Sequence, residues 1–325
     1  EDDKQSTVSP CLYKQLSKTE KLIANQSYGE AQSKLLKILE DVEKGSYGEA
    51  TVLRSLSSVY ALQEKYGKAA DALSRCLSLG VLPAAQEQHA MLNLGQLYMA
   101  MEQYQEAVKV LEPWLARNPK RDTQVYVLMA NAYAQMKQDR KALPYIKKAI
   151  QSSKKPVESW YQLNLALYYE LEEYASAARI LEKMMRYFPD KKEYWEQASS
   201  VYQQSKQYKK AVTIKHLAYQ KGYIEKEKDL LGMINLFLYV DAPYRAASIL
   251  KKEIKQGRIK SNSRNWEILA NAWTQAREFD KAVIALETAS KMHEKGKLYQ
   301  QLGRIYVEQE KWDKAVGALS RALDK

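Results

Sequence analysis

An alanine recurs along this chain at intervals of 33 to 38 residues, and this periodicity constrains the fold more than any other feature. The nine alanines are Ala31, Ala69, Ala107, Ala142, Ala177, Ala211, Ala246, Ala282 and Ala315. Self-similarity at a fixed period is typical of proteins whose repeated units stack to bury a continuous core. We therefore expect a solenoid, in which each repeat contacts its neighbours, and not a globule with one central core.

The residues around each alanine repeat as well. Seven of the alanines follow an aromatic residue by three positions, namely Tyr28, Tyr66, Tyr104, Tyr174, Tyr208, Phe279 and Trp312. Nine positions before the alanine stands another aromatic residue in every repeat but the first, as at Tyr133 and Tyr306. A mostly small residue, such as Gly95 or Ser199, precedes that aromatic by three positions. Small residues on two helices let their backbones approach, and aromatic rings fill the groove beside them.

This pattern matches the tetratricopeptide repeat, most fully from Leu302 to Ala315. The resemblance implies an all-α, right-handed α-α superhelix of about nine helix-turn-helix repeats. The repeats are expected to begin near residues 12, 50, 88, 123, 158, 192, 227, 263 and 296 of a single domain over 1–325, after a tail at 1–11. Pro119 and Pro189 fall where the second helix of a repeat should stop, and Pro156 falls two positions later in its repeat. The first repeat is atypical, and Pro243 replaces the usual aromatic in the seventh.

In such a superhelix the second, fifth, ninth and twelfth residues of each repeat line the concave surface. In the third to fifth repeats these positions predict a groove with almost no charge, formed by His89, Leu92, Gln96, Met99, Gln124, Val127, Asn131, Gln162, Ala166 and Tyr169. Amides can hydrogen-bond an extended backbone, and Met or Leu can accept apolar side chains. The sequence thus predicts a site for a protein segment, with plain solvated surface as the alternative.

The net charge of +12 would suit nucleic acid, an anionic membrane or an acidic partner. A basic residue precedes six of the alanines, at Lys68, Lys141, Lys210, Arg245, Lys281 and Lys314, which are expected at the start of the second, convex helix. We interpret them as solvated side chains. Nucleic-acid binding would need exposed aromatic residues among the charges, and here most aromatic residues occupy packing positions. No nucleic-acid partner is therefore expected.

No catalytic, cofactor or metal site is predicted. The three histidines, His89, His216 and His293, are scattered singly, and there is no Gly-rich phosphate loop. No apolar run reaches the roughly 18 residues that span a bilayer, so no membrane-spanning helix is expected. Cys76 takes the place of a small core residue. It could pair with Cys11, or both thiols could be free.

The segments 216–223, 235–250 and 269–282 resemble a family of secreted tetratricopeptide proteins of gammaproteobacteria encoded beside TonB-type energy-transduction systems. The resemblance implies a periplasmic adaptor that works with TonB, ExbB and ExbD. The alternative is a scaffold of polysaccharide export that binds glycan or an export partner, and an enzyme is a distant third reading.

Overall fold

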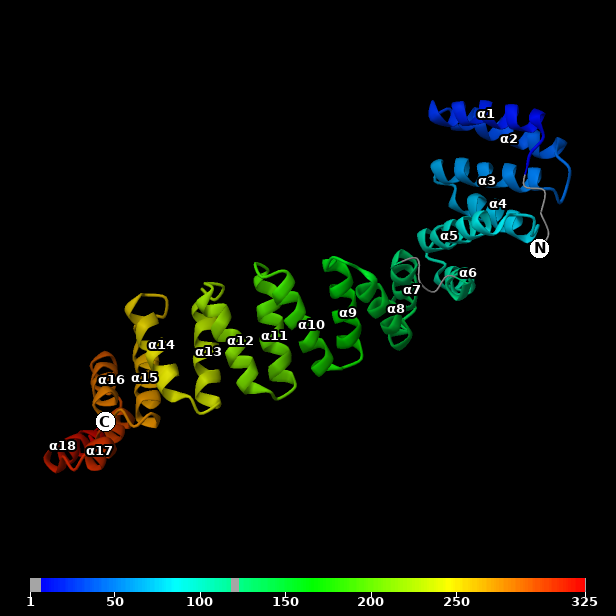
Figure 1. Cartoon of the computed structure of the whole chain (residues 1–325). Helices are drawn as coiled ribbons and strands as arrows, with labels where there is room; N and C mark the ends of the chain where they lie inside the picture. Colours follow the sequence, from blue (N-terminus) through cyan, green and yellow to red (C-terminus); the bar gives the residue numbers. More distant parts are fainter. Residues whose placement is uncertain (1–6, 118–122, 325) are drawn as a thin grey trace. The chain divides into compact units, whose positions relative to one another are not determined.

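The computed structural model describes residues 7–117 and 123–324, and these residues form eighteen helices and no strand (Figure 1). The all-α prediction of helical repeats is confirmed. The chain divides into two compact units, residues 1–172 and 173–325. Unit 1 contains α1 (Pro10–Ala24), α2 (Tyr28–Asp41), α3 (Tyr47–Leu62), α4 (Tyr66–Ser78), α5 (Ala84–Ala100), α6 (Tyr104–Arg117), α7 (Thr123–Gln135), α8 (Asp139–Ser152) and α9 (Glu158–Glu170).

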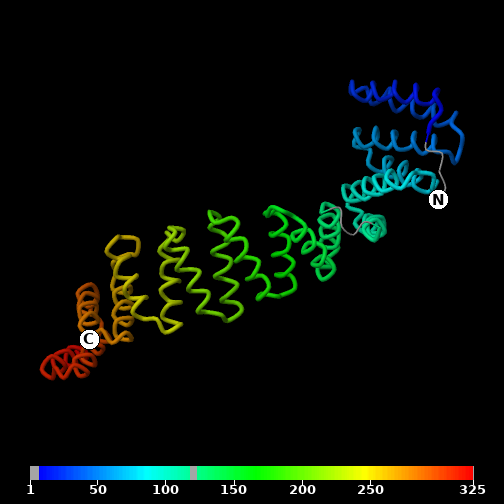
Figure 2. Tube along the Cα trace, viewed as in Figure 1, coloured from blue at the N-terminus to red at the C-terminus, as the bar shows by residue number. Residues whose placement is uncertain are grey.

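Unit 2 contains α10 (Tyr174–Tyr187), α11 (Lys192–Gln204), α12 (Tyr208–Gln220), α13 (Glu227–Tyr239), α14 (Pro243–Lys255), α15 (Ser263–Gln275), α16 (Phe279–Met292), α17 (Gly296–Glu308) and α18 (Trp312–Leu323). Within each unit the helices follow one another as antiparallel hairpins along the trace (Figure 2). Whether all 325 residues form one domain stays a prediction.

Six odd-numbered helices, from α7 to α17, begin at the residues where repeats were expected to begin, and the first three differ. Helix α1 begins at Pro10, two residues before the expected start, while α3 and α5 begin three and four residues early, at Tyr47 and Ala84. The hydroxyl of Ser9 accepts a hydrogen bond from the Leu12 amide at 3.2 Å, and proline occupies the first helical turn. This N-cap followed by proline starts α1 early, so the expected tail is too long at its end.

The recurring alanines are the closest points of each hairpin. Eight of them are 0% exposed and Ala315 is 3% exposed. Two of the small residues opposite them, Ser57 and Ser199, donate hydrogen bonds from their hydroxyls to the carbonyls of Ala69 and Ala211, at 2.8 and 3.0 Å. At Gly95 a Cβ atom would lie 2.6 Å from a methyl of Leu111, closer than atoms can approach. The small residues therefore set how closely the two helices pack.

The turn inside each hairpin has a feature that the sequence did not indicate. Five residues before every recurring alanine, a residue other than glycine adopts a φ between 55° and 60°; these residues are Gln26, Glu64, Glu102, Lys137, Glu172, Lys206, Asp241, Arg277 and Glu310. This left-handed conformation crowds a Cβ atom against the backbone. It is retained because the buried contacts on both sides of the turn fix the path of the chain.

The aromatic residues that open the second helices were expected to fill grooves, and this prediction is wrong for two of them. Tyr66 is 37% exposed and Trp312 is 61% exposed. Each is the first residue of its helix, next to the turn, where its ring stays open to solvent. Pro189 follows the end of α10 and Pro156 follows the end of α8, as expected, while Pro119 lies outside the described residues.

Both cysteines are free thiols. Cys76 is buried and donates a hydrogen bond from Sγ to the Ala50 carbonyl at 3.2 Å, whereas Cys11 is exposed. The core position expected for Cys76 is confirmed. The pairing with Cys11 is not formed.

Replacing Ala177 by Leu should lower the free energy of unfolding by about 1–3 kcal/mol, because the site is fully buried and the added atoms must displace the side chains around it. Ala175→Leu is the matched control, since Ala175 lies in the same helix and is exposed. Urea unfolding followed by helical circular dichroism measures both changes. Equal midpoints for the two variants would contradict the close packing inferred at Ala177.

Candidate interaction surface

The predicted groove begins on α5, which presents His89, Leu92, Gln96 and Met99. These residues are spaced by three or four positions, so they share one face of the helix. His89 is exposed and the other three are partly exposed. The opposite face of α5 buries Ala90, Leu94 and Gly95. The face therefore contains amide, thioether and aliphatic groups within reach of a ligand.

Helices α7 and α9 present the remaining predicted residues in the same way. On α7, Gln124 is exposed and Val127 and Asn131 are partly exposed. On α9, Gln162 and Ala166 are exposed and Tyr169 is partly exposed. None of the ten residues is buried, and all ten belong to α5, α7 and α9 of unit 1, each the first helix of its repeat. The structure does not test whether a ligand binds them, so the binding role stays a proposal.

Three contacts hold α5 in position against α6. The indole Nε1 of Trp114 donates to the Gln88 carbonyl at 2.9 Å. Arg117 forms an ion pair with Glu87 at 3.0 Å, near the start of α5. Gly95 admits the side chain of Leu111. These contacts fix the rotation of α5, and with it the face on which His89 to Met99 lie.

A charged residue borders this face, and the sequence analysis did not name it. Arg54 of α3 donates a hydrogen bond to the side-chain oxygen of Gln86 on α5. The Gln86 amide in turn donates to the Tyr47 hydroxyl at 2.8 Å. The guanidinium is thus held between α3 and α5. Arg54 is the fifth residue of the repeat expected to begin near residue 50, and this position was the only signal for it in the sequence.

The lysines that precede the alanines also contact aromatic rings. Their Nζ atoms lie over the aromatic ring of their own repeat, from 4.7 Å for Lys281 over Trp273 to 6.0 Å for Lys68 over Tyr60. The other such pairs are Lys141–Tyr133, Lys210–Tyr202 and Lys314–Tyr306. A cation over an aromatic face contributes about 0.5–1 kcal/mol at an exposed site. Part of the positive charge therefore stabilises the hairpins.

Three of these tyrosines also bind a carboxylate of the preceding hairpin. The Tyr133 hydroxyl donates to Glu112 at 2.5 Å, Tyr306 donates to Glu287 at 3.3 Å, and Tyr202 donates to Glu182. Burial, reinforced by the hydrogen bond to glutamate, raises the pKa of Tyr133 and of Tyr202 above the usual value. Lysine, tyrosine and glutamate thus form a polar chain that joins neighbouring hairpins.

Alkaline unfolding should report these raised pKa values. A free tyrosine has a pKa of about 10, so the unfolded chain loses these protons first. The stabilisation is then fully present below pH about 10 and is lost as pH rises toward the pKa of the folded state. Urea midpoints measured from pH 8 upward should fall less steeply for the double variant Tyr133→Phe, Tyr202→Phe than for the wild type. Tyr13→Phe, at an exposed site, should leave the slope unchanged.

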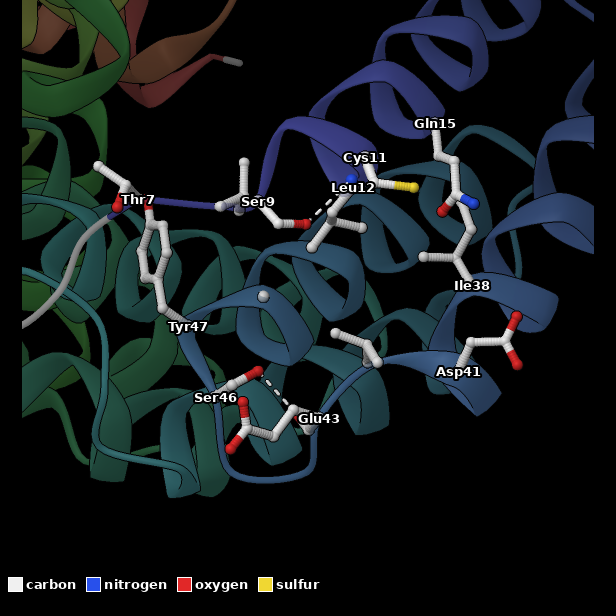
Figure 3. A pocket seen from close by; sticks show the side chains of 13 residues that line it. Thr7, Ser9, Cys11, Leu12, Gln15, Ile38, Asp41, Glu43, Ser46 and Tyr47 are labelled. Carbon is white, nitrogen blue, oxygen red and sulfur yellow. Dashed lines mark hydrogen bonds between the residues drawn. The ribbon is translucent and has the colours of Figure 1, made fainter.

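A cavity of about 410 Å³ lies apart from this surface, between the start of α1 and the connection from α2 to α3 (Figure 3). Leu12, Ile38 and Val42 contribute apolar atoms to it, and Asp41 and Glu43 contribute carboxylates. The exposed Cys11 also lines it. None of the ten groove residues does.

The two thiols should differ sharply in reactivity. Burial raises the pKa of Cys76 to about 11, so at pH 8 it is neutral as well as shielded. We expect Ellman's reagent to modify one thiol quickly at pH 8, and the variant Cys11→Ser to lose that fast reaction. Cys76 should react only after urea is added. A chain with no reactive thiol before reduction would instead have the two cysteines paired.

Among residues 7–117 and 123–324, no three histidine, cysteine, aspartate or glutamate side chains gather as a metal site would require. His89 is exposed on α5, His293 is exposed at the end of α16, and His216 is partly buried on α12. No described helix is both long enough and apolar enough to cross a membrane.

Family models and solved structures were compared with the chain. Tetratricopeptide repeat models match residues 60–132 and 298–325, and a model of anaphase-promoting complex, cyclosome, subunit 3 matches residues 100–184. The structure of Naa15/Naa10 bound to HypK-THB is 15% identical, covers 85% of this chain and 39% of that chain, and has a TM-score of 0.53. The curated proteins include no match.

Two further solved structures are repeat proteins of bacteria. A tetratricopeptide repeat protein from Parabacteroides merdae is 13% identical, covers 97% of this chain and 100% of that chain, and has a TM-score of 0.48. The C-terminal part of a repeat protein from Cytophaga hutchinsonii is 17% identical, covers 85% of this chain and 95% of that chain, and has a TM-score of 0.47. The repeat models support the tetratricopeptide repeat family, whose fold suggests a protein-interaction scaffold. None of these matches concerns a TonB system.

Proposed function

We propose that this chain, whose repeats match the tetratricopeptide models, is a non-catalytic scaffold that holds an extended segment of a partner protein in unit 1. One observation carries the proposal: the ten predicted residues all reach solvent, on one face each of α5, α7 and α9. The residues matched by the first repeat model include all of α5 and most of α7.

The chemistry of this face suits a backbone more than a charged group. Gln96, Gln124, Asn131 and Gln162 each offer an amide that both donates and accepts, which is what an extended peptide backbone requires. The Met99 thioether is flexible, so it can adapt to different apolar side chains. Since none of the ten residues is Lys, Arg, Asp or Glu, affinity should depend little on salt.

The proposed partners are TonB, ExbB and ExbD in the periplasm. What supports this is the sequence resemblance of segments 216–223, 235–250 and 269–282 alone. Purified TonB, ExbB and ExbD, each passed over the immobilised chain, test it directly. If none is retained, the TonB association fails. A protein that is retained serves as the ligand in the test of the groove.

The groove itself is tested by placing two cations in it. The double variant Gln124→Arg, Asn131→Arg adds two long charged side chains to the α7 face, and should weaken partner binding at least tenfold by steric exclusion and loss of two amides. The double variant Gln105→Arg, Gln151→Arg is the control, because it makes comparable changes at exposed positions of the second helices α6 and α8. Isothermal titration calorimetry gives both affinities.

Helical circular dichroism should show that both variants stay folded. Equal affinities for the two variants would place the partner outside the groove. Polysaccharide fragments added to the same cell distinguish a glycan ligand, which would give heat without the protein partner.

A further inference from the structure

A second cavity, of about 630 Å³, lies in unit 2 and is lined by residues of α12 and α14. Figure 1 labels these two helices, which are the second helices of neighbouring hairpins. The lining of this cavity differs from that of the groove, because it is rich in charged and aromatic groups. Helix α12 contributes His216 and Tyr219, α14 contributes Ser248 and Lys252, and the connection after α14 contributes Arg258. The sequence analysis assigned His216 to no site, and the structure places it partly buried in this wall.

A buried carboxylate organises one end of the cavity. Glu253 is 0% exposed, and it accepts a hydrogen bond from the Tyr219 hydroxyl at 2.5 Å. Arg258 donates a hydrogen bond from Nη2 to the same oxygen at 2.8 Å, and its Nε lies 2.5 Å from the second oxygen in an ion pair, although that oxygen accepts no hydrogen bond. Because Glu253 is fully buried and is bound by both side chains, it fixes the positions of both Tyr219 and Arg258.

Two cations lie over the Tyr219 ring. The Lys252 ammonium lies 5.5 Å from the ring centre, and the Arg258 guanidinium lies 5.7 Å from it. His216 stacks on the same tyrosine, with ring centres 6.0 Å apart and planes 18° apart, and contacts Phe237 of α13 edge-on at 5.4 Å. The imidazole is thus held at the cavity wall by rings from two helices.

The charges around the cavity do not balance. Glu253 neutralises Arg258, and Lys252 forms no ion pair with any described residue. Arg245 of α14 adds a further positive charge near His216, and together with burial, the larger cause, it lowers the pKa of that imidazole. A cavity with excess positive charge and several N–H and O–H donors attracts anions.

We propose that the cavity between α12 and α14 binds an oxyanion, either a carboxylate or a tetrahedral phosphate-like group, through Lys252, Arg258, Ser248 and His216. The Lys252 ammonium, the Ser248 hydroxyl and the imidazole N–H supply donors, and Arg258 supplies those not engaged by Glu253. This site is independent of the groove in unit 1, so the proposed function and this proposal can fail separately.

The three histidines of the chain provide the measurement. Each gives one Hε1 proton resonance, which His→Gln variants assign, so His89 and His293 serve as internal controls for His216. Sulfate, a tetrahedral anion whose charge is constant near neutral pH, and acetate are titrated separately at constant ionic strength in sodium chloride. The His216 resonance should shift until the site is saturated, while the resonances of His89 and His293 should stay unchanged. The anion that binds with the higher affinity identifies the chemistry of the ligand.

A bound anion should also raise the pKa of His216. The groups that face this imidazole are Tyr219 on α12, Arg245 and Lys252 on α14, and Arg258 beyond α14, of which the last three are cations. An anion among them favours the imidazolium, so the pKa measured with saturating anion should be higher than that without it, and binding should tighten as pH falls through that range. An unchanged pKa would overturn the role given to His216.

The variant Lys252→Gln should weaken anion binding at least tenfold. Lys251→Gln is the matched control, because it removes the same charge from the preceding residue of α14, which does not line the cavity, and its affinity should stay within twofold of the wild type. Equal affinities of these two variants, or equal shifts of all three histidines, would show general ionic attraction and overturn the proposal. Helical circular dichroism checks that both variants fold.

Discussion

The structure depends on one constraint, the close approach of the two helices of each hairpin at a recurring alanine. A methyl group is the largest side chain that these positions admit, since eight of the nine alanines have no exposed surface. Where the facing residue is serine, its hydroxyl donates to the alanine carbonyl, as Ser57 does to Ala69. The two helices then pack closely without leaving the buried hydroxyl unpaired. Where it is glycine, as at Gly95, a leucine of the second helix fills the space that a Cβ would need. The pairing of helices, the turn between them and the exposed face of the first helix all follow from this contact.

The same contact decides where charge is placed. The residue before the alanine lies in the first turn of the second helix. In five repeats it is a lysine whose ammonium lies over the tyrosine or tryptophan ring of the first helix. Tyrosine hydroxyls then reach carboxylates of the preceding hairpin, as Tyr133 reaches Glu112. A large basic excess is thus compatible with a protein-binding role, because part of it stabilises the repeats and needs no polyanionic ligand to explain it.

The two surfaces differ in the chemistry that they offer. The proposed groove of α5, α7 and α9 contains no Lys, Arg, Asp or Glu among its ten residues and lies on first helices, which favours a peptide backbone as the proposed ligand. The cavity between α12 and α14 lies on second helices, which contain many of the lysines. Buried Glu253 holds Tyr219 and Arg258 in place, so the hydrogen-bond donors of this basic surface have fixed positions. In these two proposals, the groove binds the backbone of a partner protein, and the cavity binds a negatively charged group.

The periodicity alone determined the fold class and the placement of most helices, because a buried alanine, a small residue and a ring at fixed spacing can be satisfied together by one helical hairpin. It also identified Cys76 as a core residue and put the ten groove residues on exposed faces. The sequence could not reveal contacts between residues far apart in the chain. The left-handed turn residues are all polar but include no glycine or asparagine, the residues that usually mark this conformation. Arg54 contacts Gln86 across 32 positions, and Tyr219 contacts Glu253 across 34. Each of these depends on how neighbouring repeats stack, and this is fixed by side-chain packing across the interface between hairpins and not by the pattern within any one of them.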